Sequence, residues 1–169
     1  MRWYRKAADA GDTSAMNNIG WLYENGCGVS RDYTEAMKWY RKAADAGNAM
    51  AMNNIGWLYQ HGHGVSQDYT EAMKWYRKAA DAGHALAMYN IGVLYHNGWG
   101  VSQDDTEAMR WYCKAADAGD ADAAQRLRER DEPDAAQRLR ERDEPDWWEN
   151  NWWWVALIVG FLVLYACSR

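Results

Sequence analysis

A period of 36 residues runs through most of the chain and constrains its fold more than any other feature. The segment MKWYRKAADAG occurs at 37–47 and again at 73–83, with close variants one period to either side. A fixed period of this length is typical of a solenoid, in which no unit can bury its apolar face without its neighbours. The full units predicted from the period are 13–48, 49–84 and 85–120.

The second half of each unit has the pattern of an amphipathic helix. In the first unit, Asp32 followed three residues later by Glu35 predicts a capping box at the start of the helix. Gly47 occupies the position of a left-handed residue at its end. Apolar residues recur between them at helical spacing and predict a buried stripe. The members of this stripe are Ala36, Trp39, Tyr40, Ala43 and Ala44.

A first helix precedes this second helix in each unit. In the second unit Asn48 is the expected N-cap, and the loop 61–68 uses two glycines to turn the chain into the next helix. Gly56 costs about 1 kcal/mol of helix propensity relative to Ala. Because Gly20 and Gly92 recur at the same slot, we expect another helix to pass close by there. The apolar stripe of this helix comprises Ala51, Met52, Ile55, Gly56, Leu58 and Tyr59.

The unit AMNNIGWLYxxGxGVxxDYTEAMKWYRKAADAG resembles the Sel-one-like repeat (SLR), a relative of the tetratricopeptide repeat. The resemblance covers about residues 1–128 and rests on the G-x-G-V-x-x-D loop and the W-Y-x-K-A-A helix. It implies an all-α fold, a right-handed superhelical solenoid of helix pairs whose first helices line a concave face. It also implies an adaptor or scaffold that binds other proteins, without naming a ligand.

Two partial units flank the full ones. Residues 1–12 match the second helix of a unit, and we expect either the remaining part of a longer array or an N-terminal cap; the sequence leaves both open. Beyond residue 120, Ala123, Ala124 and Leu127 match apolar slots of a further first helix before arginines interrupt the pattern. A polar final helix suits the end of a solenoid, and we predict a capping helix over 121–132.

Differences between the three full units predict where a partner binds. Three slots of the first helix differ at i, i+4, i+7 spacing, which places them on one face. Exposed Trp and Tyr are frequent anchors of protein-binding hot spots. We predict a protein-binding site there; the alternative is surface drift, with Trp21 and Trp57 packed between repeats. The predicted site on the concave face comprises Asn17, Trp21, Glu24, Asn53, Trp57, Gln60, Tyr89, Val93 and His96.

Composition and the remaining motifs argue against several other functions. The net charge of −5 disfavours nucleic-acid binding. His61 and His63 have no third ligand at suitable spacing, so no metal site is predicted. Nucleophile–base pairs and phosphate-binding glycine motifs are absent from the sequence, so we predict no catalysis, no cofactor and no small-molecule substrate. The basic residues of the second helices are interpreted as a solvated outer face balanced by Asp45, Asp81 and Asp117, with a lipid-binding or phosphate-binding strip as the alternative.

The three cysteines separate the chain from one branch of the family that it resembles. Cys27, Cys113 and Cys167 are odd in number and lack paired spacing. The secreted cysteine-rich branch pairs two cysteines within each repeat and has been linked to β-lactam binding. That chemistry is therefore not carried over, and a β-lactam-binding, hydrolase-like relative is kept only as an alternative.

A duplicated charged segment follows the repeats. The sequence AAQRLRERDEPD occurs at 123–134 and again at 135–146. Pro133 and Pro145 each limit a helix. We predict a charged spacer with a Trp-rich junction over 133–151; whether 133–146 is helical or disordered stays open.

The residues 152–167, WWWVALIVGFLVLYAC, carry no charge and predict a single C-terminal transmembrane helix. At 1.5 Å per residue the segment spans about 24 Å, somewhat less than a hydrocarbon core of about 30 Å. Tryptophans around its start predict an interfacial aromatic belt. The alternative is an apolar helix docked on the solenoid. The belt comprises Trp147, Trp148, Trp152, Trp153 and Trp154.

These features together predict a membrane-tethered adaptor that binds a protein partner on its concave face. Because residues 1–20 lack a secretory signal pattern, we expect the repeats in the cytosol. They would be lumenal or periplasmic if the true start lies upstream, as in a quality-control or envelope adaptor. A truncated gene remnant is a further alternative. The sequence decides neither the partner nor the organism nor the side of the membrane.

Overall fold

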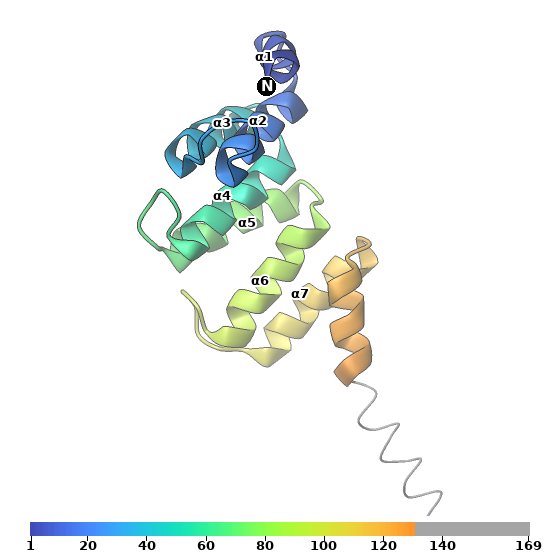
Figure 1. Ribbon diagram of the computed structural model, residues 1–169. Helices are drawn as coiled ribbons and strands as arrows, with labels where there is room; N and C mark the ends of the chain where they lie inside the picture. The colour runs from blue at the N-terminus through green and yellow to red at the C-terminus, as the bar shows by residue number, and fades with distance from the viewer. Residues whose placement is uncertain (131–169) are drawn as a thin grey trace, which may run out of the picture. The chain divides into compact units, whose positions relative to one another are not determined.

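The computed structural model describes residues 1–130 (Figure 1). Seven helices follow one another, residues 121–130 are helical as well, and these described residues contain no strand. The predicted all-α repeat solenoid is therefore confirmed for this part of the chain. The chain divides into two compact units, Met1–Leu127 and Arg128–Arg169, and the packing below is that of the first. The helices are α1 (Arg2–Asp9), α2 (Thr13–Asn25), α3 (Tyr33–Asp45), α4 (Ala49–His61), α5 (Tyr69–Asp81), α6 (Ala85–Asn97) and α7 (Asp105–Asp117).

The helices pack in chain order, each against the one before it and the one after it (Figure 1). Within the three repeats the pairs are α2 with α3, α4 with α5 and α6 with α7. Contacts of α3 with α4 and of α5 with α6 join one repeat to the next, and α1 packs on α2. Every helix therefore depends on a neighbour from its own repeat or the adjoining one, as the period predicted.

Side-chain caps fix where most helices begin. Asp32 Oδ1 accepts hydrogen bonds from the backbone N–H groups of Thr34 and Glu35 at the start of α3. The predicted capping box is only half formed, because the Asp32 N–H donates to the Tyr23 carbonyl at 2.9 Å. The Glu35 carboxylate is thereby left to pair with Lys38 one turn further along α3.

The N-cap of α6 is an exception among these helices. His84 occupies the slot of Asn48, whose Oδ1 accepts a hydrogen bond from the Ala51 N–H at 2.9 Å, but His84 makes no such side-chain bond. Within residues 1–130 its buried Nδ1 has no hydrogen-bond partner. Burial lowers the pKa of His84, since a charged imidazolium would lose its hydration there.

A tyrosine from each second helix packs on the glycine of the first helix in the same repeat. A Cβ atom added to Gly56 would lie 2.7 Å from the ring of Tyr76, and one added to Gly20 would lie 2.6 Å from the ring of Tyr40. Gly92 and Tyr112 repeat the contact. The expectation that a helix passes close to Gly56 is therefore confirmed, and the side chain that fills the space is the tyrosine.

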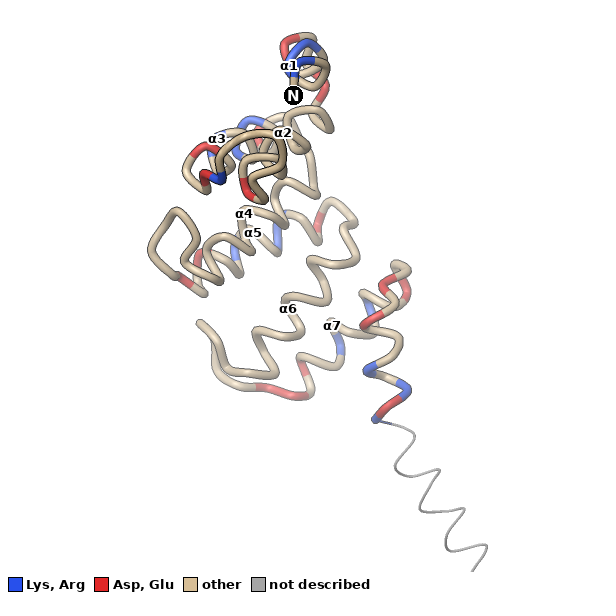
Figure 2. The backbone as a smooth tube through the Cα atoms, viewed as in Figure 1, with Lys and Arg blue, Asp and Glu red and all other residues tan. Residues whose placement is uncertain are grey.

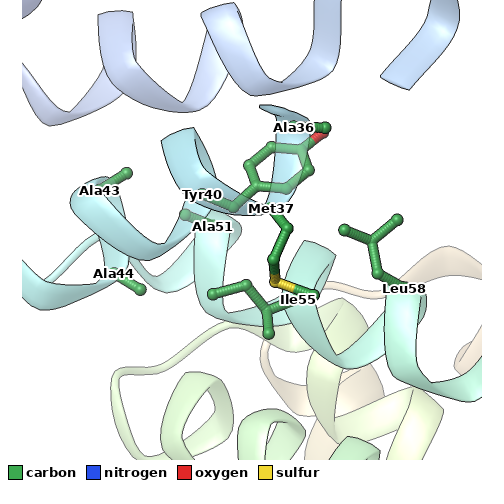
Figure 3. Packing of buried hydrophobic residues seen from close by; sticks show 8 residues of the cluster. All are labelled: Ala36, Met37, Tyr40, Ala43, Ala44, Ala51, Ile55 and Leu58. Carbon is green, nitrogen blue, oxygen red and sulfur yellow. The ribbon is translucent and has the colours of Figure 1, made fainter. Parts of the chain in front are cut away.

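The core consists of similar clusters at successive repeats. In the cluster of Figure 3, Met37 of α3 reaches toward Ile55 of α4. The predicted stripe of α3 is correct for its alanines and Tyr40, but it missed Met37 and placed Trp39 too deep. Trp39 is half-buried, because its ring packs on the preceding cluster around Ile19. The buried members of the cluster are Ala36, Met37, Tyr40, Ala43, Ala44, Ala51, Ile55 and Leu58.

A further first helix follows the third repeat. Asp120 Oδ1 accepts from the Ala123 N–H at 2.8 Å, and Ala123 is fully buried, like Ala51 and Ala87 in the equivalent slots. The helical residues 121–130 cover most of the capping helix predicted over 121–132.

The predicted spacer and membrane segment, 133–151 and 152–167, lie outside the described residues, as do the five tryptophans of the predicted belt. Among the helices of residues 1–130, none has the length and apolar character required to cross a membrane.

Replacing Gly56 with Ala tests the tyrosine–glycine contact. Helix propensity alone favours the substitution by about 1 kcal/mol, but the new methyl group would collide with the Tyr76 ring in a packed core. We expect a net loss of about 1–3 kcal/mol of unfolding free energy in urea titrations. In a Tyr76→Leu background the same substitution should cost clearly less. Equal costs in both backgrounds would show that the ring does not set the constraint.

Candidate protein-binding surface

The first helices of successive repeats are joined by side-chain hydrogen bonds. Asn54 Nδ2 of α4 donates to Asn17 Oδ1 of α2 at 3.0 Å, and Asn90 Nδ2 of α6 donates to Asn53 Oδ1 of α4 at 3.0 Å. The two residues of each bond lie 37 positions apart, so the same bond recurs with the repeat. These bonds place α2, α4 and α6 side by side.

The next bond of this series changes its chemistry. Arg126 lies in the slot of Asn54 and Asn90, and its Nε donates to the Tyr89 hydroxyl at 2.9 Å. The guanidinium of Arg126 also lies over the rings of Tyr89 and Tyr112, 5.6 Å from each centroid. Tyr89 therefore contacts the capping helix through both its ring and its hydroxyl.

Two residues of the predicted binding site are not on the surface. Asn17 and Asn53 are each only 4% exposed, although they lie on the helix face that the sequence pattern assigned to the binding site. The side-chain oxygen of each accepts a hydrogen bond from an asparagine of the neighbouring first helix, and the part of both residues in partner binding stays a prediction.

Large apolar side chains of the first helices remain exposed around these asparagines. Trp21 is 50% exposed, Met50 53% and Leu86 41%. Trp57, Tyr89 and Val93 from the predicted site are half-buried. The comparison of units in the sequence missed Met50 and Leu86. These residues share one slot with Ser14 of the first unit, and because this slot also differs between the units, the same comparison could have found them. We call the following six residues the first-helix face: Trp21, Met50, Trp57, Leu86, Tyr89 and Val93.

The helices that carry this face are almost free of charge. Helices α4 and α6 contain no Lys, Arg, Asp or Glu, and α2 contains Glu24 alone (Figure 2). Charged residues concentrate on α1, α3, α5 and α7. A partner on the first-helix face therefore meets apolar and neutral polar groups.

The predicted site residues Glu24, Gln60 and His96 share one slot but differ in their contacts. Glu24 accepts a hydrogen bond from the hydroxyl of the core residue Tyr40, and Gln60 Oε1 accepts one from Tyr76 at 2.8 Å. Burial raises the pKa of Glu24, although the Tyr40 hydrogen bond and His63 oppose this shift. In the first two repeats the side chain at this slot therefore accepts a hydrogen bond from a buried tyrosine of the core.

In the third repeat His96 occupies this slot and makes no hydrogen bond to the core tyrosine, Tyr112. It is exposed, and its Nδ1 lies 2.8 Å from Asp105 Oδ1. The Tyr112 hydroxyl is buried and has no hydrogen-bond partner within residues 1–130.

The loop residues His63 and Trp99 occupy one slot that differs between units, and both pack on the preceding repeat. The ring of His63 stacks on Tyr33 at 4.6 Å between centroids, and Trp99 stacks on Tyr69 at 5.3 Å. His61, at the end of α4, instead contacts Trp57 of its own helix, with 4.4 Å between the ring centroids. Within residues 1–130 there is no group of three or more His, Cys, Asp or Glu side chains that could hold a metal ion.

The basic side chains of the second helices have partners other than those expected. Lys78 Nζ lies 4.1 Å from the centroid of Trp75, and Arg77 donates to the Tyr95 hydroxyl at 3.0 Å. Lys74 pairs with Glu71 one turn earlier at 2.9 Å. These cations are thus in contact with aromatic rings and with first-turn glutamates. The interpretation of the sequence had instead assigned the balancing of their charge to Asp45, Asp81 and Asp117.

The helix pairs, their repeat and the uncharged first-helix face define a helical-repeat scaffold. The Sel1 repeat family matches residues 1–12, 13–48, 49–84 and 85–120, and the chain belongs to this family. The resemblance recognised in the sequence is therefore confirmed. Sel1-repeat proteins generally mediate protein–protein interactions, and their fold is typically a non-catalytic scaffold.

Two solved structures share substantial sequence identity with the chain. A Sel1 repeat protein from Oxalobacter formigenes is 43% identical with a TM-score of 0.69, over 72% of this chain and 50% of that one. A protective antigen of uropathogenic Escherichia coli strains, which displays an SLR fold, is 41% identical with a TM-score of 0.70, over 75% of this chain and 27% of that one. The chain thus spans at most half of either protein.

More distant matches show the fold alone. Cysteine rich protein B of Helicobacter pylori is 20% identical with a TM-score of 0.58, over 73% of this chain and 89% of that one. No curated protein sequence matches the chain significantly. Cys27 and Cys113 are free and exposed in the described part of the chain, so they form no pair of the kind expected in the cysteine-rich branch.

Replacing a core tyrosine with Phe should change the unfolding free energy differently in the second repeat and in the third. Tyr76→Phe removes the hydrogen bond to Gln60 and should cost about 1 kcal/mol of unfolding free energy. Tyr112→Phe removes a buried hydroxyl that has no partner in the described residues, so it should be neutral or stabilising. Both can be measured by urea unfolding. A Tyr112→Phe cost as large as that of Tyr76→Phe would show that the Tyr112 hydroxyl is bonded in solution.

Proposed function

We propose that this chain is a membrane-tethered scaffold that binds a protein partner on its first-helix face. The observation that carries the proposal is the exposure of Trp21, Met50 and Leu86 on three consecutive first helices joined side by side. Exposed apolar side chains gathered on one surface mark protein-interaction sites, and aromatic anchors dominate the energy of many such sites. The general role of Sel1-repeat proteins supports this choice.

The composition of the C-terminal sequence supports the membrane part of the proposal. Residues 152–167 carry no charge, and five tryptophans lie at or just before the start of this segment. The preceding residues 133–151 are highly charged, as suits a spacer between a scaffold and a lipid surface. We place the repeats in the cytosol, with a lumenal or periplasmic location as the alternative if the natural start lies upstream.

Loss of partner capture tests the protein-binding role. The full chain and a Trp21→Ser/Met50→Ser/Leu86→Ser variant are expressed in native membranes, and proteins cross-linked to each are compared by mass spectrometry. We expect the variant to lose the captured partner while its circular dichroism spectrum stays unchanged, because all three side chains are exposed. A Trp3→Ser/Tyr4→Ser variant is the control, since it removes exposed aromatic residues from α1 instead. Equal capture by all three proteins would refute the assignment of the face.

Carbonate extraction of native membranes tests the tether. The full chain should stay in the membrane pellet, because a spanning apolar segment resists extraction while peripheral proteins do not. A variant without residues 147–169 is the control and should be released. Protease digestion of sealed membranes then reports the side of the repeats. Release of the full chain by carbonate would refute the membrane tether and leave the binding role to its own test.

A further inference from the structure

A side-chain hydrogen bond joins the two helices of a repeat near the end of the first helix. In the first repeat the Glu24 carboxylate accepts it from the Tyr40 hydroxyl, and in the second repeat Gln60 Oε1 accepts it from Tyr76 at 2.8 Å. In each case 16 positions separate the two residues. The slot on the first helix therefore takes an acceptor of either kind, a carboxylate or an amide oxygen.

The third repeat contains the same two slots without the bond. His96 precedes Tyr112 by the same separation, and the Tyr112 hydroxyl is buried with no hydrogen-bond partner within residues 1–130. The His96 ring is instead exposed, and its Nδ1 lies 2.8 Å from Asp105 Oδ1. A buried donor thus lacks an acceptor, while the side chain in the acceptor slot contacts a different group.

The protonation state of His96 decides whether it can accept this bond. A neutral imidazole has one N–H donor and one acceptor nitrogen, whereas an imidazolium has two donors and no acceptor. Imidazole Nε2 lies about as far from Cβ as the side-chain oxygen of Gln does. Rotation of His96 between staggered rotamers can therefore bring it to the position that Gln60 Oε1 has beside Tyr76. Burial raises the pKa of Tyr112, so its hydroxyl keeps the proton that it would donate.

The balance between the two positions of His96 changes with its charge. When the imidazole is neutral, the inward position gives the buried Tyr112 hydroxyl an acceptor, and only an exposed contact with Asp105 is lost. When the imidazole is charged, the contact with Asp105 becomes an ion pair. The inward position would then bring a positive charge toward Arg126, whose guanidinium lies 5.6 Å from the centroid of the Tyr112 ring. Protonation therefore favours the outward position.

The elements packed against α6 bring other charged or titratable groups to this part of the repeat. They are Asp104, Glu107 and Arg110 on α7, Arg77 on α5, Tyr59 and His61 on α4, and Tyr89 and Tyr95 on α6 itself. Each of these side chains is bonded to a group other than His96. Asp105 and Arg126 are thus the charges that distinguish the two positions of the imidazole.

We propose that His96 is a pH-operated switch in the third repeat. The charged imidazolium pairs with Asp105 on the outside, and the neutral imidazole turns inward and accepts a hydrogen bond from the Tyr112 hydroxyl. The inward position withdraws an exposed imidazole from α6 and completes the bond that the first two repeats already have. The switch goes beyond the proposed function, because both of its bonds lie within one repeat and need no partner.

Urea unfolding of the full chain in detergent micelles tests the switch at about pH 5 and about pH 8, because imidazoles titrate between these values. At the lower pH the midpoint of Tyr112→Phe should equal or exceed that of the unaltered chain, which is the outcome expected above for the outward position. At the higher pH it should fall below the unaltered chain by about as much as Tyr76→Phe does, since both substitutions then remove one bond. Groups that titrate elsewhere act on both chains and cancel in the difference.

His96→Gln provides the matched control, because Gln60 already accepts the equivalent bond in the second repeat. In this background Tyr112→Phe should lower the midpoint at both pH values, since an amide oxygen accepts at either. In the unaltered background, a difference between Tyr112→Phe and the parent chain that is the same at both pH values would overturn the switch.

The reactivity of the imidazole reports its position. At about pH 8 neutral, exposed imidazoles react with diethyl pyrocarbonate, and mass spectrometry gives the rate for each histidine. We expect Tyr112→Phe to raise the rate at His96 severalfold, because loss of the hydroxyl releases the ring to solvent. The exposed His61 should react at an unchanged rate and serves as the reference. If the His96 rate is the same in both chains, the ring does not turn inward and the proposal is wrong.

Discussion

The contact between a second-helix tyrosine and a first-helix glycine is the constraint on which each repeat depends. The ring of Tyr76 lies so close to Gly56 that even a methyl group would collide with it, and the same holds for Tyr40 on Gly20. Because the ring is fully buried, its hydroxyl needs an acceptor, and Gln60, one turn after Gly56 on the same face of α4, provides it. The tyrosine–glycine pair thus fixes how closely the two helices approach, and the tyrosine hydroxyl requires a hydrogen-bond acceptor one turn further along the first helix.

Because the same unit is repeated along the solenoid, a contact made in one repeat recurs at the equivalent positions of the next. Bonds between first helices recur at a separation of 37 residues, and arginine–tyrosine bonds between α3 and α4 and between α5 and α6 recur at 18. Many slots therefore keep one structural role from repeat to repeat, and a slot whose contacts differ between repeats is informative. Met50 offers a sulfur that accepts from Asn17, whereas Leu86 in the same slot has no acceptor atom. Arg126, in the slot of Asn54 and Asn90, bonds Tyr89, which occupies the slot of their partners Asn17 and Asn53.

The distribution of charge follows from the same geometry. Second helices expose long cationic side chains, and aromatic rings and first-turn glutamates lie beside these cations. First helices use asparagine side chains on one another and leave apolar side chains exposed around these asparagines. Binding at the first-helix face is therefore expected to depend on apolar contact and neutral hydrogen bonds more than on charge.

The sequence by itself determined the period, the helix pairs, the glycine slot and most N-caps, because these depend on residues close together in the chain or on repetition that is visible in it. Only the tertiary structure decided which polar side chains are buried. Asn53 looks like a surface residue on its own helix, and α6 buries it; Trp39 looks like a core residue, and the step to the neighbouring repeat leaves it half-buried. The physical reason is that helical periodicity specifies the direction of a side chain around its own axis, whereas burial depends on how far and at what angle the next repeat lies.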